Sequence, residues 1–356
     1  MLRAIEYKKG VVLILDQSRL PHVITDIKCT NWRLVSRCIK ELKIRGAPAI
    51  GIAAAMGYAL GAEAVNAKDP GALLEKLAPV YEGLFGSRPT AVNLGWALER
   101  MRAKALSLAE EGISVRKIKD ALWREARLIH EEDIKINKAI GVWGSQFIKD
   151  GDVVLTHCNA GALATGGYGT ATAPIFQAHE QGKRIHVIVD ETRPVLQGAR
   201  LTALEMREAG IPMTLITDNS AGALLHQGRI NLAIVGTDRT TRNGDVANKI
   251  GTYSVAVLCK ENKVPFYVAA PLSSIDFSMR SGGLIPIEQR HENEVFFISG
   301  KRIAPTGIRA ANLAFDVTPA KYVTAIITEV GAFRPVHLKK LASGGGAGLD
   351  AVRYAP

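Results

Sequence analysis

The sequence is poor in cysteine, which limits the chemistry that its thiols can support. Four of its 356 residues are cysteines, at positions 29, 38, 158 and 259, and no two of them have C-x-x-C spacing. Four separated cysteines are too few for the disulfide framework of a small secreted protein and do not match a zinc site. We therefore expect free thiols. Cys29, Cys38 and Cys259 stand in apolar stretches whose pattern predicts helices, where a thiol is an inert core residue.

Long hydrophobic runs are also absent. The longest apolar stretch, "APAIGIAAAMGYALGA", is rich in Ala and Gly and shorter than the ~20 residues that a membrane-spanning helix needs. The first 20 residues alternate charged and apolar side chains and lack the apolar core of a signal peptide. We expect a cytoplasmic protein with no membrane partner.

Aromatic residues make up only 6% of the chain, although its formal net charge is +11. The Lys and Arg residues are scattered, and no basic run alternates with the aromatic side chains that stack on bases. Nucleic acid is therefore not an expected partner. A positive field also attracts small anionic metabolites toward a cleft, and we favour that interpretation.

The apolar pattern changes along the chain. After short strand-like stretches in the first 30 residues, the spacing is helical, as in "LGWALERMRAKALSL". Six short β-branched runs then alternate with helical segments, namely "DVVLTH", "RIHVIVD", "MTLITD", "LAIVG", "PFYVAA" and "VTAIIT". The prediction is an α/β protein. It has a mainly helical N-terminal domain with a few short strands over residues 1–120, a Rossmann-like, doubly wound parallel sheet over residues 121–341, and a Gly-rich tail over residues 342–356.

Reactive side chains follow four successive predicted strands. Cys158, Asp190, Asp218 and Asp238 each stand at or just after the end of one of them. Open α/β sheets bind ligands beyond the carboxyl ends of their strands. Any one of these acids is as easily explained as a turn or helix-cap residue, but four strand ends together, with a cysteine, favour a site.

The Gly-rich loop after Cys158, "NAGALATGGYGTATAPI", lacks the motifs of common cofactors. It contains neither the dinucleotide-binding pattern G-x-G-x-x-G with a following acid nor the G-K-[ST] of a phosphate-binding loop. The sequence therefore predicts no NAD, no ATP and no other cofactor. We also expect no metal, because no cluster of His, Cys and carboxylates has ligand spacing.

Two arginines precede prolines at predicted helix starts. Arg45 comes shortly before Pro48, and Arg88 comes directly before Pro89. Proline favours the first helical turn, and a helix N-terminus with a nearby guanidinium binds phosphate well. Either arginine alone is more simply a solvated residue near a cap. Their recurrence in a basic protein favours a phosphate group.

Long blocks of the sequence resemble a known family. The strings "RGAPAIGIAAA", "SRPTAVNL", "THCNAGALATGGYGTATAPI", "DETRPVLQGARLTALEM", "GTDRTTRNGDVANKIGTYSVAVL" and "AFDVTPAKYVTAIITEVG" are similar to those of the 5-methylthioribose-1-phosphate isomerase family. The similarity extends roughly from Arg45 to Gly331. It implies a methionine-salvage enzyme that interconverts an aldose and a ketose phosphate, takes a phosphorylated pentose and forms a homodimer. The wider superfamily includes ribose-1,5-bisphosphate isomerases and regulatory subunits of a translation initiation factor.

The resemblance also implies site residues. It assigns catalysis to Cys158 and Asp238, and substrate contacts to Arg45, Gly46, Ala47, Arg88, Gln197, Asn248 and Lys249. The family's "GADRIAANGD" is "GTDRTTRNGD" here, which adds Thr237, Thr240 and Arg242, and its "NPAFD" is "NLAFD" at residues 312–316. Arg242 leaves the substituent at the sugar's C5 open.

The expected chemistry explains the need for a thiol and a carboxyl group. The anomeric carbon of an aldose 1-phosphate is blocked, so opening the ring needs a general acid. We assign that role to Asp238 in its protonated form, and removal of the C2 proton to Cys158 as thiolate. A hydride shift, with Cys158 only stabilising charge, is the competing scheme. The neighbouring His157 either lowers the pKa of the thiol or, as favoured by strand alternation, is a structural residue on the other face.

Two other functions stay open at this point. A ribose-1,5-bisphosphate isomerase would need a second cationic pocket for a phosphate at C5. A non-enzymatic regulatory subunit would not need Cys158 and Asp238 together.

Overall fold

The computed structural model describes residues 2–8, 10–89, 91–343 and 354, and it divides into two compact units. The first unit comprises Leu2–Ile136 and Ala162–Gly169, and the second comprises Asn137–Gly161 and the described residues from Thr170 onward. The division falls inside one continuous helix, α5 (Val115–Ser145), rather than after residue 120. An uninterrupted helical pattern does not show where a helix changes its packing partners. Most of the predicted Gly-rich tail, residues 344–353 and 355–356, lies outside the described residues.

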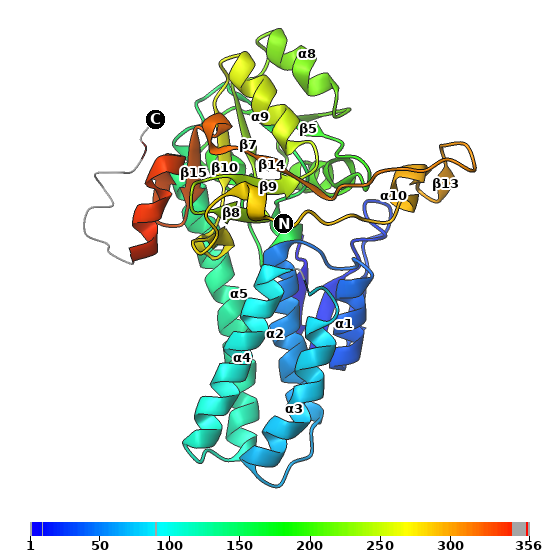
Figure 1. Ribbon diagram of the computed structural model, residues 1–356, viewed down its shortest axis with the longest axis vertical. Helices are drawn as coiled ribbons and strands as arrows, with labels where there is room; N and C mark the ends of the chain where they lie inside the picture. The colour runs from blue at the N-terminus through cyan, green and yellow to red at the C-terminus, as the bar shows by residue number, and fades with distance from the viewer. Residues whose placement is uncertain (1, 9, 90, 344–353, 355–356) are drawn as a thin grey trace. The chain divides into compact units, whose positions relative to one another are not determined.

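The first unit combines a small antiparallel sheet with a helical bundle (Figure 1). The strands are β1 (Ile5–Lys8), β2 (Val11–Leu15) and β3 (Asp26–Cys29), paired in that order. The helices are α1 (Trp32–Lys40), α2 (Ala47–Ala64), α3 (Pro70–Phe85) and α4 (Val92–Glu110), followed by the first part of α5. Asn31 and Asp69 cap α1 and α3, since their side chains accept the N–H groups of Leu34 and Ala72 at 3.0 and 2.9 Å.

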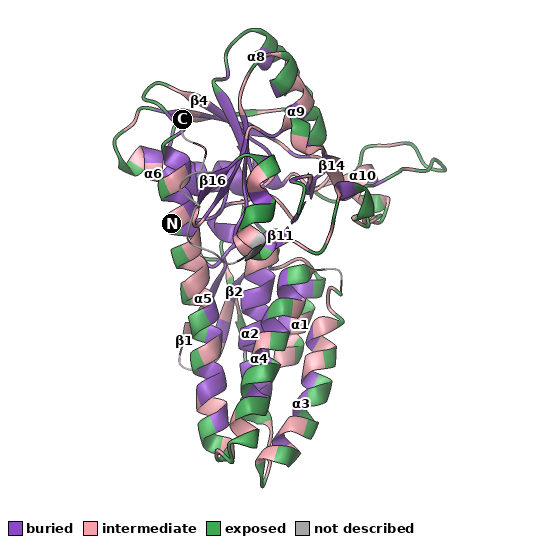
Figure 2. Cartoon of the chain, turned by 60° about the vertical axis from the view of Figure 1, so that its left-hand side comes forward, coloured by how far each residue is buried: buried purple, intermediate pink, exposed green. Residues whose placement is uncertain are grey.

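Helix α2 forms the centre of this bundle. It packs against α1, α3 and α4, and almost its whole length is buried, as the purple of Figure 2 shows. Such a helix must be apolar on every side, which its sequence of Ala, Gly and Ile provides. Small residues also allow close packing: a Cβ at Gly51 would stand 2.8 Å from the Asn93 carbonyl oxygen of α4.

The second unit is built on a seven-stranded sheet in the order β16-β15-β10-β7-β4-β5-β6. Its strands are β4 (Val153–Thr156), β5 (His186–Asp190), β6 (Met213–Ile216), β7 (Leu232–Val235), β10 (Phe266–Ala269), β15 (Ala325–Thr328) and β16 (Gly331–Phe333). All neighbours are parallel except β15 and β16. Each of the six predicted runs forms a strand, and the predicted doubly wound sheet is confirmed.

Helices follow the strands of this sheet, as its winding requires. They are α6 (Thr172–Glu180), a π-helical turn η2 (Gly198–Thr202) that continues into α7 (Ala203–Glu208), α8 (Ser220–His226) and α9 (Thr252–Glu261). Helix α9 packs on β7 and β10. Short 3-10 segments are η1 (Ala162–Ala164), η3 (Leu272–Ser274), η4 (Gly282–Leu284), η5 (Ala320–Tyr322) and η6 (Pro335–Ser343).

A second, smaller sheet of four strands was not expected from the sequence. Its order is β11 (Ile275–Asp276), β8 (Arg239–Thr241), β9 (Val246–Lys249) and β14 (Phe315–Thr318). A short helix α10 (Asn293–Phe296) leads into the hairpin β12 (Phe297–Ile298) and β13 (Lys301–Arg302). Among the residues described, no helix has the length and apolar character to cross a membrane.

One local prediction is wrong. Cys29 ends strand β3, and only Cys38 lies in a helix of that stretch, because the Asn31 cap separates the two elements. Both thiols are fully buried, with their sulfur atoms 3.9 Å apart. Cys259 lies buried in α9, as predicted.

Candidate active site

Four neighbouring strands of the large sheet carry reactive side chains at the same edge. Cys158 follows β4, Asp190 ends β5, Asp218 follows β6 and Asp238 follows β7. These strands are adjacent in the order β7-β4-β5-β6 and run parallel, so their carboxyl ends meet. The winding reverses direction between β4 and β7, which is the point where open α/β sheets bind ligands. Cys158 and Asp238 follow those two strands.

The backbone of Cys158 is held in an unusual conformation. Its φ of 66° is in the left-handed region, which costs a non-glycine residue about 1–3 kcal/mol. Its N–H donates to Thr192 Oγ1 at 2.9 Å, and its carbonyl oxygen accepts Thr202 Oγ1 at 2.6 Å. Asp218 fixes Thr192 in turn by accepting the N–H groups of Thr192 and Arg193, each at 2.7 Å. The loops after β5 and β6 therefore hold in place the backbone that carries the half-buried thiol.

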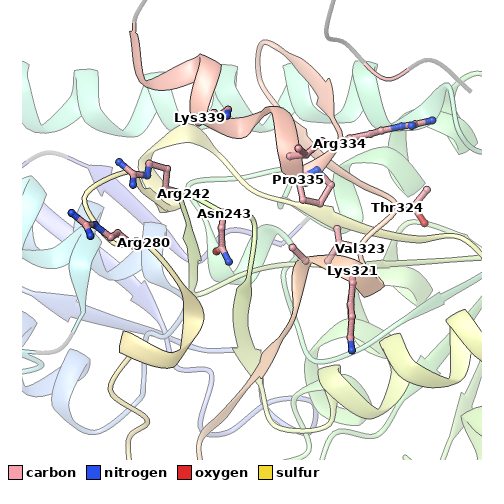
Figure 3. A pocket seen from close by; sticks show the side chains of 11 residues that line it. Arg242, Asn243, Arg280, Lys321, Val323, Thr324, Arg334, Pro335 and Lys339 are labelled. Carbon is pink, nitrogen blue, oxygen red and sulfur yellow. The ribbon is translucent and has the colours of Figure 1, made fainter.

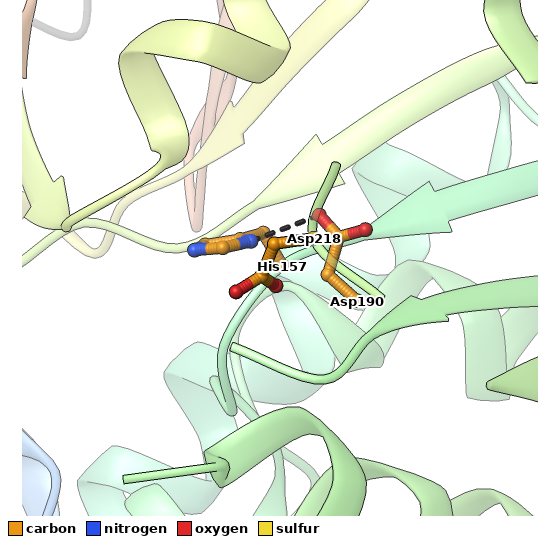
Figure 4. Close-up of side chains that lie close together, drawn as sticks. All are labelled: His157, Asp190 and Asp218. Atoms are coloured by element: carbon orange, nitrogen blue, oxygen red, sulfur yellow. Dashed lines mark hydrogen bonds and ion pairs between the residues drawn. The ribbon is translucent and has the colours of Figure 1, made fainter. Parts of the chain in front are cut away.

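His157, the residue before Cys158, forms a buried pair with Asp190 (Figure 4). The His157 ring meets Asp190 Oδ2 through Nδ1 at 2.9 Å and the Ile250 carbonyl oxygen through Nε2 at 2.8 Å. The Ile250 oxygen is only an acceptor, so Nε2 carries a proton, and the contact with Asp190 needs a second proton on either group. Burial opposes a charge on the ring, but the hydrogen bond and charge of Asp190 outweigh it and raise the pKa of His157. Burial also raises the pKa of Asp190.

His157, Asp190 and Asp218 lie close enough together to suggest a metal site, with potential ligand atoms all within 4.8 Å of one another. Apart from Asp190 Oδ1, however, their polar atoms already have hydrogen-bond partners among the described residues. Asp218 accepts two backbone N–H groups, and His157 bridges Asp190 and a carbonyl oxygen. The arrangement is that of a hydrogen-bonded cluster that supports the loops around Cys158. The position of His157 agrees with the structural role that strand alternation favours.

The β8–β9 hairpin positions three of the predicted residues. The Asp238 N–H donates to the Ala247 carbonyl oxygen at 3.0 Å, and the pairing of Arg239 with Ala247 puts Asp238 opposite Asn248. Asn248 and Lys249 are 6% and 7% exposed. Burial lowers the pKa of Lys249, and the charges of Cys158 and Asp238 act against that lowering. The Lys249 ammonium group is thus in electrostatic reach of both candidate catalytic residues.

Gln197 lies at the start of the π-helical turn η2. It is 8% exposed, and its Oε1 has no hydrogen-bond partner among the described residues. The turn packs tightly on β5, since a Cβ at Gly198 would stand 1.7 Å from the Asp190 carbonyl oxygen. A buried amide oxygen without a partner is costly unless a ligand donates to it. Gln197 thus suits the substrate contact that the sequence predicts.

The remaining predicted residues belong to the first unit. Gly46 caps α2 with a φ of 92°, and a Cβ there would stand 2.3 Å from the Ala164 carbonyl oxygen, so only glycine fits. Arg45 and Ala47 flank it at the helix start, as predicted. Arg88 does not stand at a helix start. The Ala91 N–H bonds to the Arg88 carbonyl oxygen, and this turn puts Pro89 ahead of α4, which begins at Val92.

Sequence reasoning missed the residues that support the site. Thr192 and Thr202 hold the Cys158 backbone; both lie in the block "DETRPVLQGARLTALEM", but no role was assigned to either from the sequence. Glu294 near Lys249 is paired with Arg290 and accepts Asn312 Nδ2 at 3.0 Å. Within that block, Thr192 is marked only by a hydroxyl just after a predicted strand, and that feature is too common to single out a residue.

Comparisons with known proteins agree with this architecture. The sequence model of the "Initiation factor 2 subunit family" matches residues 43–335. The methylthioribose-1-phosphate isomerase of Geotalea uraniireducens (strain Rf4) is 52% identical over 339 residues, which cover 95% of this chain and 97% of that protein.

Two solved structures are also similar. The 5-methylthioribose 1-phosphate isomerase from Pyrococcus horikoshii OT3 has a TM-score of 0.91 and 43% identity, covering 97% of each chain. The translation initiation factor eIF-2B, subunit delta, from A. fulgidus has a TM-score of 0.86 and 43% identity, covering 95% of this chain and 97% of its own. By these matches the chain belongs to the initiation factor 2 subunit family, among its methylthioribose-1-phosphate isomerases.

Proposed function

We propose that this chain converts 5-methylthioribose 1-phosphate into 5-methylthioribulose 1-phosphate, as a step of methionine salvage in the cytoplasm. The observation that carries the proposal is the position of Cys158 and Asp238, which follow the two strands where the sheet reverses its winding. The names of the relatives supply the substrate. The homodimer is likewise part of the proposal and rests on the family resemblance.

Asp238 acts as the general acid. In the aldose, C1 carries the phosphate and is bonded to the ring oxygen, so the ring opens only when that C1–O bond breaks. Protonated Asp238 delivers its proton to the ring oxygen, which becomes the hydroxyl group at C4. The electron deficiency at C1 then makes the hydrogen on C2 acidic.

Cys158 acts as the general base. Its thiolate removes the C2 proton, and the electron pair forms the C1–C2 double bond of an enediol phosphate. Return of a proton to C1, with release of the proton of the C2 hydroxyl group, yields the ketose. The thiolate is favoured by the cation of Lys249, whose charge interacts with Cys158 within the second unit. The left-handed backbone of Cys158 holds the sulfur in place before the substrate binds.

Other predicted residues bind the substrate. Gln197 Oε1 has no donor in the described part of the chain and accepts a sugar hydroxyl group, and Asn248 lies on β9 opposite Asp238. In the first unit, Gly46 and Ala47 present N–H groups at the start of α2, an arrangement that favours anions. We assign the phosphate group to that helix start together with Arg45 and Arg88.

One experiment distinguishes the proposed isomerase from a ribose-1,5-bisphosphate isomerase and from a non-enzymatic regulatory subunit. The purified protein is incubated in D₂O with 5-methylthioribose 1-phosphate or ribose 1,5-bisphosphate, and the C1 and C2 protons are followed by NMR, with Cys158→Ser as the matched control. We expect the methylthio sugar alone to be converted, with deuterium entering at C1. Transfer of the C2 hydrogen to C1 without uptake of deuterium would favour a hydride shift. No turnover of either sugar would favour a regulatory subunit, as one structural relative's name suggests.

A further inference from the structure

A pocket lies in the second unit, at the tip of the hairpin whose base carries Asp238 and Asn248. Strand β8 ends at Thr241, and the pocket begins with the next residues, Arg242 and Asn243. Its volume is about 590 Å³, a size suited to a small organic ligand. Its walls are formed by Arg242, Asn243, Arg280, Ala320, Lys321, Val323, Thr324, Arg334, Pro335, Val336 and Lys339.

The lining is cationic. Five of these residues are Lys or Arg, and none is Asp or Glu. Arg334 and Lys321 lie over the rings of Tyr354 and Tyr322, at 5.3 and 5.0 Å from the ring centres. Within the described part of the chain, none of the five forms an ion pair with a carboxylate. Their mutual repulsion would be relieved by a ligand with several negative charges.

The walls are held together by one carboxylate behind them. Asp245 Oδ1 accepts the Ala320 N–H at 2.8 Å, and its Oδ2 accepts the Gly282 N–H and Asn243 Nδ2, both at 2.9 Å. Three separate segments of the wall are thereby tied to one side chain. The Arg242 N–H also donates to the Met279 carbonyl oxygen at 3.0 Å, which brings the chain at Arg242 beside that at Arg280. The pocket is therefore formed before a ligand arrives.

The pocket has a charged end and an apolar wall. Figure 3 shows Arg242 and Arg280 near each other at one end, with Pro335 and Val323 farther along. Pro335 and Val323 are buried behind the surface, and Val336 is 65% exposed at the rim. Phosphate groups suit the paired guanidinium groups, and a flat or apolar moiety suits the Pro and Val side chains.

We propose that this pocket binds a small organic polyphosphate of the nucleotide class, at a site distinct from the candidate active site. The phosphates bind at Arg242, Arg280 and Lys339, and the rest of the molecule packs on Pro335 and Val323. The proposal does not depend on the proposed isomerase activity.

Calorimetric titration of the full chain tests the proposed polyphosphate site, with tripolyphosphate and ATP as probes and no divalent cation. We expect one saturable site in which ATP binds more tightly than tripolyphosphate. The variant Arg242→Ala/Arg280→Ala should bind both at least about tenfold more weakly, because each charge-assisted contact is strong. The control Arg229→Ala removes an exposed charge of the same unit outside the pocket, and should bind within about twofold of the wild type.

Several results would overturn the proposal. The absence of saturable binding would overturn it. Equal loss of affinity in Arg229→Ala and in the double variant would also overturn it, because the phosphates would then be attracted by the general positive charge and not by this pocket. Binding lost in Lys249→Met but kept in Arg242→Ala/Arg280→Ala would put the anion at the candidate active site instead. ATP that binds no more tightly than tripolyphosphate would refute a role for the apolar wall. Circular dichroism of each variant verifies that the fold is intact.

Discussion

Replacing His157 with Ala tests the buried pair that supports the candidate site. The change removes both hydrogen bonds of the imidazole ring, to Asp190 Oδ2 and to the Ile250 carbonyl oxygen. Asp190 is fully buried, and its Oδ1 has no hydrogen-bond partner among the described residues. Without His157, neither oxygen of that carboxyl group keeps a hydrogen-bond partner in the part of the chain that the structure describes.

The expected loss of stability is large. Breaking a buried pair by removing one partner costs about 3–5 kcal/mol, against about 5–15 kcal/mol for unfolding a whole domain. The variant His157→Ala/Asp190→Asn should recover more than about 1 kcal/mol, because a buried amide is less costly than a buried carboxylate. His186→Ala is the matched control. That histidine lies partly exposed on β5 and makes one side-chain bond, so its loss should cost less than about 1.5 kcal/mol.

The pair also predicts how stability depends on pH. The pKa of His157 is raised above its ordinary value of 6.5, so the folded protein holds a proton that the unfolded chain releases near that pH. The stabilisation is complete below pH 6.5 and is lost as pH rises through the raised pKa. The free-energy difference between wild type and His157→Ala should therefore shrink in alkaline solution.

Urea unfolding at fixed protein concentration, followed by circular dichroism between pH 5.5 and about pH 9, measures these differences. A His157→Ala variant that unfolds within about 1 kcal/mol of wild type at every pH would refute the reasoning. The same conclusion would follow if the second change, Asp190→Asn, gave no recovery. Either result would mean that the two side chains are not coupled.

The other predictions concern binding, the nucleophile and close packing. Arg45→Ala and Arg88→Ala should each raise KM by about tenfold to a hundredfold, since charge-assisted contacts to phosphate are worth about 1.5–3 kcal/mol. An unchanged KM in both variants would refute the assignment of the phosphate group to these arginines. Cys158→Ser should lose activity by orders of magnitude with an unchanged circular dichroism spectrum, and substrate should slow alkylation of the wild-type thiol by iodoacetamide. Gly198→Ala puts a Cβ 1.7 Å from a carbonyl oxygen and should lower Tm sharply, whereas Gly283→Ala, with no atom within 4 Å, should not.

The large sheet was predictable because its strands are short, continuous β-branched runs, typical of strands buried on both faces. The polar residues at their ends then followed from the general position of ligand sites in such sheets. Sequence alone, however, could not show that β4 and β7 are neighbours. That pairing is what brings the loops of Cys158 and Asp238 to one place.

Features that depend on distant contacts were not predictable. The four-stranded sheet pairs short polar segments such as Arg239–Thr241 with partners far along the chain. The bond between His157 and Asp190 likewise joins the residue just after β4 to the last residue of β5. Neither leaves a local pattern, because such contacts are decided by tertiary packing rather than by propensity.

The central claim is that Asp238 delivers a proton to the ring oxygen, and the pH profile of kcat/KM for wild type and Asp238→Asn tests it most directly. Asn keeps the size and can hydrogen-bond the substrate but cannot donate the proton. We predict normal substrate binding with kcat lowered by ~10² to 10⁴-fold, and loss of the alkaline limb that the wild-type acid produces. Near-normal turnover by Asp238→Asn, with the wild-type pH profile, would contradict the claim and leave Asp238 as a turn residue after β7.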